Sequence, residues 1–336
     1  MRSSVQLRFK RPSRRAGTFG PLGAYCLGPA FIAILCGVAM QSARAEEVWY
    51  GTNNHQPDFL DLFNPDAAWA KAAAGISAIE FASDVALRAP LDQLQKIMAN
   101  VRQRNLKLVV GLGPLSGPGP HDCGQRVEGY SAPGEPLAVA TRLKSVGAQP
   151  QYFLMDEPLY YGHVFGRAES GCHTTIHDIA RDVASKLRQV RTVFPEVRFG
   201  DIEPLTGFSN KTWLSDLESW LDEFEAETGE KLAFFQLDLA WHEPWQDRIP
   251  ALVRLLRSRG VPLHVIYDGN GNETSDKEAI ANTIAHFKEY ESSGRSPPDV
   301  AVIQYWTPHP SRSLPETDPG TATYVIDRYL SWRRLR

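Results

Sequence analysis

The stretch from residue 151 to residue 202 decides the fold. It opens with QYFLM (151–155) and closes with VRFGDI (197–202), two short runs rich in β-branched and aromatic residues. Between them an apolar residue recurs at helical spacing, at Ile176, Ile179, Val183, Leu187 and Val190. This pattern predicts a strand, a helix with one buried face, and a second strand. Because a crossover helix separates the two strands, we expect them to lie parallel in one sheet.

The same unit recurs along the body of the chain. Runs of this kind occur eight times, at 48–52, 76–82, 107–112, 151–155, 197–202, 233–239, 262–267 and 300–305. A second single-faced helical stripe consists of Leu91, Leu94, Ile97, Met98 and Val101. Eight strand–helix units in residues 46–336 predict one α/β domain, a (β/α)8 TIM barrel. No Gly-x-Gly-x-x-Gly follows the first run, so an open dinucleotide-binding sheet loses its main support.

Charge is distributed unevenly over the 336 residues, of which 43% are hydrophobic and 22% charged. Residues 1–45 contain seven of the 36 basic residues and none of the 39 acidic ones. Residues 46–336 therefore hold 29 basic against 39 acidic residues, a formal charge of −10. A body this acidic argues against binding to a phosphate backbone, so we expect no nucleic-acid partner.

The segment without acids has the order of an export signal. Its basic part precedes an apolar run over residues 21–40, and Ala43-Arg44-Ala45 then supplies the small-x-small site of signal peptidase. We expect residues 1–45 to be a cleaved signal peptide and residues 46–336 to be the barrel domain, exported to the periplasm or the extracellular space. The apolar run is also about long enough to span a bilayer, so an uncleaved anchor is the alternative. After cleavage we expect no stable membrane insertion.

Two cysteines remain beyond this segment, Cys123 and Cys172. An even number in an oxidising compartment predicts a disulfide. In the chain-entropy model, a bridge that closes about 50 residues stabilises the fold by roughly 4 kcal/mol. Two free thiols or half of a metal site are the alternatives, but neither cysteine lies in a Cys-x-x-Cys motif or has a histidine at ligand spacing.

Acids, amides and aromatic rings stand where most of the predicted strands end. In (β/α)8 barrels the active site lies at these carboxyl ends. The candidates, in chain order, are Asn54, His55, Asp156, Glu157, Asp201, Glu203, Asp238, Trp241, Tyr267, Asp268, Tyr305 and Trp306. Carboxylates and amides can bind hydroxyl groups, while the apolar face of a pyranose stacks on an aromatic ring. We therefore expect a carbohydrate substrate.

The strand ends carry a resemblance to a known superfamily. Residues 153–158, FLMDEP, resemble the end of strand four in the clan A glycoside hydrolases. These are retaining enzymes with the (β/α)8 barrel fold. In that superfamily the strand ends in Asn-Glu-Pro and the Glu is the acid/base. The resemblance implies this role for Glu157, while Asp156, in place of the usual Asn, would bind the 2-hydroxyl of the sugar. Beside Asp156 and among aromatic rings, Glu157 should have a raised pKa and stay protonated.

The second carboxylate has two candidates. The superfamily ends strand seven in a nucleophilic Glu, whereas VIYD (265–268) ends the seventh run in Asp268. Glu203, in a similar Glu-Pro context after the fifth run, is the other candidate. Retaining enzymes need about 5–5.5 Å between the carboxyl groups and inverting enzymes about 6.5–9.5 Å. Because Asp is one methylene shorter than Glu, both outcomes stay open.

Structural roles compete with these assignments. Glu157 could cap the following helix, and Asp268 could form a turn with the glycines after it. Asp201 and Asp238 could be hydrogen-bonded barrel residues, while Tyr305, Trp306 and His55 could serve packing or structure alone.

Three functions compete as well. We favour an exported glycoside hydrolase that acts on a polysaccharide or oligosaccharide without metal or cofactor. A metal-dependent barrel enzyme would use acids with His55 or His242, yet no His-x-His or His-Glu-x-x-His motif occurs. A barrel that binds glycan without cleaving it is the third reading, and the Asp residues at 156 and 268 favour it. The sugar, the linkage and the oligomeric state do not follow from the sequence.

Overall fold

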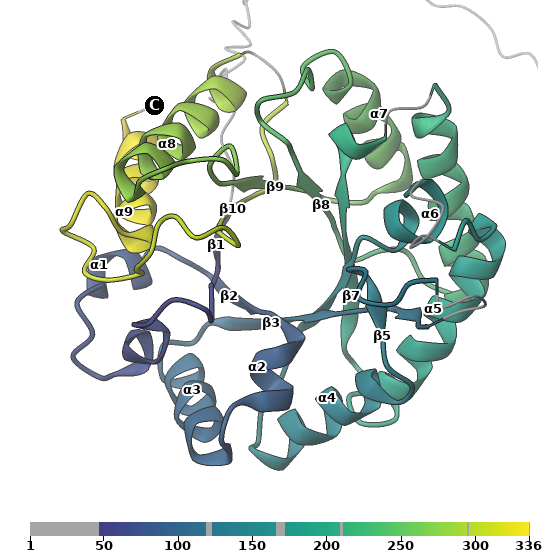
Figure 1. Ribbon diagram of the computed structural model, residues 1–336, viewed down its shortest axis with the longest axis horizontal. Coiled ribbons are helices and arrows are strands. Elements are labelled where there is room, and N and C mark those ends of the chain that lie inside the picture. The colour runs from purple at the N-terminus through teal and green to yellow at the C-terminus, as the bar shows by residue number, and fades with distance from the viewer. Residues whose placement is uncertain (1–46, 119–122, 166–171, 209–210, 294–295, 336) are drawn as a thin grey trace, which may run out of the picture. The chain divides into compact units, whose positions relative to one another are not determined.

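The computed structural model describes residues 47–118, 123–165, 172–208, 211–293 and 296–335. The expected signal peptide lies outside these residues. Parallel strands close into a barrel that helices surround (Figure 1). In order around the barrel they are β1 (Glu47–Gly51), β2 (Ala78–Phe81), β3 (Lys107–Leu112), β6 (Tyr152–Asp156), β7 (Arg198–Pro204), β8 (Phe235–Asp238), β9 (Leu263–Tyr267) and β10 (Val300–Gln304), which pairs with β1.

The eight predicted runs are the eight barrel strands, and their ends differ from the prediction by at most two residues. The runs could be recognised because parallel strands with both faces covered are apolar almost throughout. The (β/α)8 barrel expected from the sequence is thereby confirmed.

The helices occupy the outer layer of the barrel (Figure 1). They are α1 (Ala70–Ala73), α2 (Ser83–Arg88), α3 (Leu91–Gln103), α4 (Glu135–Ser145), α5 (Ile176–Arg191), α6 (Trp213–Thr228), α7 (Ile249–Arg259), α8 (Asp276–Ser292) and α9 (Ala322–Arg334), with short turns η1 (Phe59–Phe63), η3 (Tyr160–Val164) and η4 (Leu205–Gly207). Both predicted apolar stripes form helices, α3 and α5, and the stripe residues are buried except for the exposed Leu91 and the half-buried Ile176 at the helix starts. Within the described ranges, no helix combines the length and apolarity needed to cross a membrane.

A layer of apolar side chains fills the barrel interior. It contains Trp49, Ala78, Val109, Leu154, Ile202, Ala233, Phe234, Ile266, Val300 and Val302. Gly200 makes room for this layer, because a Cβ there would lie 2.2 Å from the ring of Phe234. Since side chains alternate between the two faces of a strand, these positions show which later residues point into the barrel mouth.

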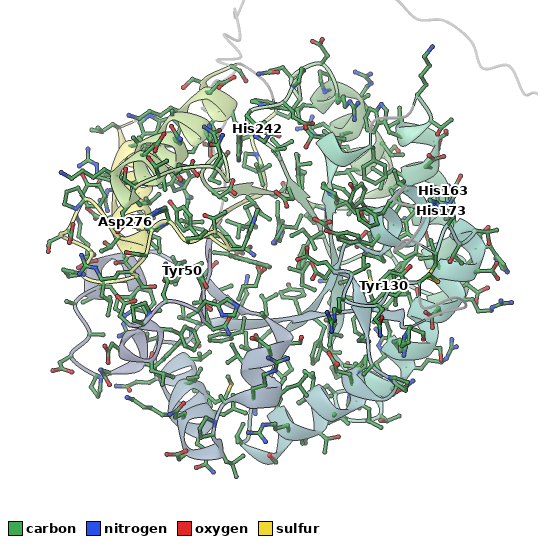
Figure 2. All side chains as sticks on the ribbon, viewed as in Figure 1. Tyr50, Tyr130, His163, His173, His242 and Asp276 are labelled. Atoms are coloured by element: carbon green, nitrogen blue, oxygen red, sulfur yellow. A yellow bond between two sulfur atoms is a disulfide. The ribbon has the colours of Figure 1, made fainter. Side chains whose placement is uncertain are left out.

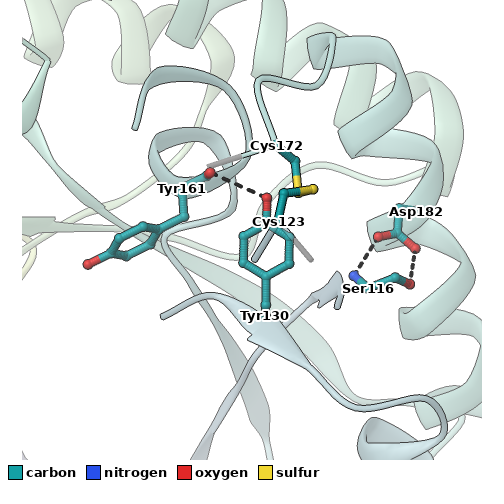
Figure 3. Close-up of a disulfide and its surroundings, with 6 residues drawn as sticks. All are labelled: Ser116, Cys123, Tyr130, Tyr161, Cys172 and Asp182. Carbon is teal, nitrogen blue, oxygen red and sulfur yellow. Dashed lines mark hydrogen bonds between the residues drawn. A yellow bond between two sulfur atoms is a disulfide. The ribbon is translucent and has the colours of Figure 1, made fainter. Parts of the chain in front are cut away.

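A disulfide joins two of the loops above the barrel. Cys123 and Cys172 are bonded, with their Cα atoms 5.1 Å apart, which confirms the predicted pairing (Figure 3). The bridge links the loop after β3, which contains β4 (Leu115–Ser116) and β5 (Tyr130–Ser131), to the segment after β6. Beside it the hydroxyl of Tyr130 donates to the carbonyl of Tyr161 at 3.4 Å. The two segments are thus held together at the mouth of the barrel.

Candidate active site

A cavity of about 740 Å³ opens at the carboxyl ends of the barrel strands. Its wall includes seven acids, of which Glu128 and Glu243 are exposed: Glu80, Glu128, Asp156, Glu157, Asp238, Glu243 and Asp268. Of the residues proposed from the sequence, those that line it are Asn54, His55, Asp156, Glu157, Asp238, Trp241, Asp268, Tyr305 and Trp306. The position matches the place where barrels of this type carry their chemistry.

Glu203 and Asp201 do not reach this cavity, which corrects their placement from the sequence. Ile202, between them on β7, belongs to the interior layer, so its two neighbours point outward toward the helices. The Glu203 carboxylate accepts hydrogen bonds from the backbone N–H groups of Leu159 at 2.7 Å and Tyr160 at 3.0 Å. Asp201 is fully buried and accepts from the indole of Trp220 at 2.7 Å. Both acids therefore accept hydrogen bonds that stabilise the fold outside the barrel.

Tyr267 is also placed differently from the expectation. It precedes Asp268, and its neighbour Ile266 on β9 faces the interior, so the Tyr267 ring packs in the outer core between barrel and helices. Its hydroxyl donates to Glu291 of α8 at 3.0 Å. It therefore does not contact a ligand in the cavity.

Glu157 sits on a strained turn directly after β6. Its φ of 47° lies in the left-handed region, which non-glycine residues rarely adopt. Its backbone N–H donates to the carbonyl of Ile202 at 3.1 Å, and its carbonyl accepts from Tyr161 at 3.0 Å. The side chain lines the cavity and is 7% exposed. Backbone strain of this kind concentrates at functional sites, where the surrounding structure maintains it.

The surroundings of Glu157 favour its protonated form. Burial is the main cause that raises the pKa of its carboxyl group well above the usual range, and the negative charges of Asp238 and Asp156 raise it further. Among the described residues, no donor forms a hydrogen bond with the Glu157 carboxylate. A carboxyl group in this setting can hold a proton at neutral pH and deliver it to a leaving group.

Asp268, after β9, has a different environment in the same cavity. It is 5% exposed, and one of its carboxylate oxygens accepts from the indole N–H of Trp241 at 2.8 Å. Burial raises its pKa and Asp238 adds to the rise, whereas the Trp241 hydrogen bond lowers it. The Trp241 ring is held in turn by stacking on His286, with ring centroids 4.5 Å apart. The net effect raises the pKa of Asp268 well above its usual range, and Trp241 orients the carboxylate and opposes that rise.

Sequence reasoning missed several lining residues. Glu80, inside run 76–82, points into the barrel and accepts from the Gln236 amide at 3.3 Å, while burial raises its pKa to about 7. The alternation of side chains relative to Ala78 of the interior layer was a usable signal for Glu80. Glu128 comes from the disulfide-linked loop and accepts from the Tyr161 hydroxyl at 3.0 Å. Its position in a loop gives no comparable signal.

The remaining polar and aromatic candidates form the rim. Trp306 is 47% exposed, an accessible indole beside the acids. The Asn54 amide donates to Asp84 at 2.9 Å, and the Tyr305 hydroxyl donates to Thr283 at 2.8 Å, so both side chains are fixed in place. The rim thus offers a fixed amide and an exposed indole.

His55 and His242 also line the cavity, and both are exposed. His242 is labelled in Figure 2. Within the part of the chain that the structure describes, no three His, Cys, Asp or Glu side chains are grouped so as to hold a metal ion.

Comparison with known proteins gives matches in structure only. No family model matches the sequence, and no curated protein matches it. A fungal β-1,4-galactanase structure matches with 11% identity and a TM-score of 0.51, over 84% of this chain and 99% of that one. The likeness is one of fold.

Two xylanase structures match less well. A psychrophilic family 10 endo-β-1,4-xylanase has 12% identity and a TM-score of 0.46, over 78% of this chain and 86% of that chain. An intracellular xylanase of Thermoanaerobacterium saccharolyticum has 10% identity and a TM-score of 0.47, over 81% and 87%. The galactanase match shows the barrel architecture in a glycoside hydrolase, and no single family is fixed.

Proposed function

We propose that the protein is an exported glycoside hydrolase that cleaves O-glycosidic bonds with Glu157 as general acid and Asp268 as its partner. One observation carries this proposal. Two buried carboxyl groups, at the ends of the fourth and seventh barrel strands in chain order, line one cavity in opposite hydrogen-bonding environments. Paired titratable groups with different environments are the mark of acid/base division in glycosidases.

In the proposed reaction the protonated Glu157 donates its proton to the glycosidic oxygen as the bond to the anomeric carbon breaks. Its raised pKa supports this role, because the group stays protonated until the leaving oxygen takes the proton. The strained turn fixes the carboxyl group above β6 without a side-chain hydrogen bond that would compete for the proton.

Asp268 supplies the negative charge on the other side of the anomeric carbon. It either attacks that carbon directly or removes a proton from the attacking water, according to the distance between the two carboxyl groups. The Trp241 N–H keeps one Asp268 oxygen occupied, so the other oxygen is left for the reaction. Trp306 offers an indole face for the sugar, and Asn54 and Asp156 stand within the wall as hydroxyl-binding groups.

Export is part of the proposal. The Cys123–Cys172 disulfide supports an oxidising compartment, in agreement with the signal peptide expected at residues 1–45.

The test is hydrolysis of a panel of polysaccharides and aryl glycosides that includes β-1,4-galactan, with Glu157→Gln compared with the wild type. A matched control is Glu225→Gln, an exposed acid of α6 far from the cavity lining. Sugar release that is lost in Glu157→Gln and kept in the control establishes a glycosidase. Release that survives in Glu157→Gln contradicts the assigned acid. Glycan binding without release from any substrate would favour the non-catalytic barrel, and loss of activity on chelation would favour a metal enzyme.

A further inference from the structure

The charge of the cavity exceeds what a two-carboxylate hydrolase needs. Two of its seven acids, Glu157 and Asp268, have roles in the proposed reaction. None of the lining residues that the structure describes is a Lys or Arg. A neutral sugar could hydrogen-bond to the protonated groups among them through its hydroxyls but would bring no charge to balance those that are ionised. Buried charges are costly unless an opposite charge accompanies them.

The surplus acids gather in one part of the cavity. Glu128 is the largest charge influence on both Asp156 and Asp238, and it acts to raise both pKa values, second only to burial. Burial and Glu128 together raise the pKa of Asp238 to about 7. Three segments far apart in the sequence therefore direct carboxylates to the same region: the disulfide-linked loop, the end of β6 and the end of β8.

Two acids of the cavity wall lack the side-chain donors that usually accompany buried carboxylates. Glu128 accepts one hydrogen bond, from Tyr161. In the described part of the chain, no side-chain donor contacts Asp156, and none contacts Glu157, which is 93% buried and lines the cavity. A donor for these two groups comes either from water in the cavity or from a bound ligand.

The geometry points to a cationic ligand, and we propose that the glycan carries free, protonated amino groups, one of which binds among Glu128, Asp156 and Asp238. An ammonium group on a pyranose supplies three N–H donors and the missing positive charge at once. Tyr161 beside Glu128, and Trp306 at the rim, offer ring faces that attract a cation as well as a sugar. The proposal builds on the assigned glycosidase function and names its substrate class as de-N-acetylated amino sugars.

The test measures binding of a glucosamine tetramer and a galactosamine tetramer by calorimetry, each compared with its fully N-acetylated counterpart. The N-acetylated sugars are matched controls, because they keep the ring and lose the charge. We expect the amino sugars to bind at least tenfold more tightly than the acetylated ones. Glu128→Gln should weaken binding of the amino sugar about tenfold and leave the weak binding of the acetylated sugar unchanged, and Asp156→Asn should also weaken binding of the amino sugar.

Glu225→Gln serves as the control for general attraction, since the whole domain is acidic. It should bind the amino sugar as the wild type does. Thermal unfolding of each variant verifies that it is folded. Equal binding of the two sugar forms overturns the proposal, as does an equal loss in Glu225→Gln and Glu128→Gln. Saturable Ca²⁺ binding that depends on Glu128 and displaces the sugar also overturns it, in favour of a metal ion.

The outcome is separable from that of the proposed hydrolysis. Preferential binding of the amino sugar without release of any product would uphold the cationic ligand and reject the glycosidase. Hydrolysis of neutral glycans that depends on Glu157, with no preference for amino sugars, would uphold the glycosidase and reject the cationic ligand.

Discussion

Two neighbouring strands end in nearly the same motif, but the glutamates of the two motifs have different roles. β6 ends in Asp156-Glu157-Pro158, and β7 ends in Asp201-Ile202-Glu203-Pro204. Glu157 lines the cavity, whereas Glu203 is fully buried outside the barrel, on the helix side of β7. A Glu-Pro sequence at a strand end therefore does not by itself define a catalytic residue. The direction of the side chain relative to the barrel interior decides its role.

The two residues are also connected. Glu203 accepts from the amides of Leu159 and Tyr160, the residues that follow Glu157-Pro158. The backbone N–H of Glu157 donates to the carbonyl of Ile202, the residue before Glu203. The outward-facing acid of β7 thus anchors the turn on which the inward-facing acid of β6 is displayed. We infer that Glu203 is a positioning residue for Glu157.

Substitutions of Glu157 and Glu203 should differ most in their effect on the catalytic rate. Glu157→Gln should lower kcat by about 10²–10⁴-fold, the usual contribution of a general acid, and leave the folded state intact. Glu203→Gln, which keeps an oxygen to accept one amide, should retain measurable turnover. Steady-state kinetics on the substrate found in the panel compares the two variants. Similar losses in both would show that the motif position alone, and not its orientation, determines the role.

The disulfide should have the next largest effect, because it braces the loops around Glu157 and has no counterpart at Glu203. Replacing both Cys123 and Cys172 with Ser should lower the free energy of unfolding by roughly 4 kcal/mol, from the entropy of a loop of about 50 residues. The loop with Glu128 should also lose order, so KM should rise more than kcat falls. Denaturant unfolding and kinetics measure both effects. Wild type in reductant is the control and should match the double variant; an oxidised and a reduced protein of equal stability would contradict the prediction.

Removal of Glu203 should destabilise the protein somewhat less. Glu203→Ala leaves the amides of Leu159 and Tyr160 without their buried acceptor, for an expected loss of about 3 kcal/mol. Turnover should also fall, because the turn that holds Glu157 at positive φ loses its support. Glu225→Ala is the matched control and should change stability little. If Glu203→Ala lowers the rate with no loss of stability, its role is not that of an anchor.

The fold could be predicted in nearly all its elements, because each barrel strand is a short apolar run and the runs have crossover spacing. Part of the site could also be predicted. A carboxylate at the end of a barrel strand reaches the mouth when it lies an even number of residues after a side chain that faces the barrel interior. Asp156 follows Leu154, and Asp268 follows Ile266, by two residues, and both interior residues set the parity. The same count shows why Glu203 points away, since it follows Ile202 by one. It fails for Glu157, which follows Leu154 by three and reaches the cavity because the left-handed turn after β6 breaks the alternation.

The rest of the site depended on contacts that no local pattern contains. Glu128 reaches the cavity because a disulfide and the Tyr161 hydroxyl hold its loop there. Gln236 pairs with Glu80 across the barrel, 156 residues away in the chain. Such contacts arise from closure of the barrel, so one sequence without its tertiary structure does not reveal them.

The smallest expected difference between acids on the two sides of the barrel wall is in how they affect the pH dependence of stability. On the cavity side, the pKa of Asp238 is about 7 in the folded protein, against the ordinary 3.8 of an unfolded chain. Between these pH values the folded protein retains a proton that the unfolded chain has lost, so the free energy of unfolding falls as pH rises from about 4 to 7. Below the unfolded pKa this contribution is fully present, and above pH 7 it is gone.

Asp238→Asn removes that titration, so it should unfold like the wild type below about pH 4 and become more stable than the wild type by about 4 kcal/mol at pH 8. Thermal unfolding across this range measures the difference, with Glu225→Gln expected to follow the wild-type curve. Burial raises the pKa of Glu203 as well, and its two backbone donors only oppose that rise, so the pH dependence of Glu203→Gln should have the same sign, on top of a pH-independent loss from the backbone amide left without an acceptor. A constant offset between Asp238→Asn and the wild type from pH 5 to pH 8 would contradict this. A pH-independent loss of stability in Glu203→Gln, with none in Asp238→Asn, would show that the acid outside the barrel stabilises the fold through its hydrogen bonds and the acid in the cavity does not.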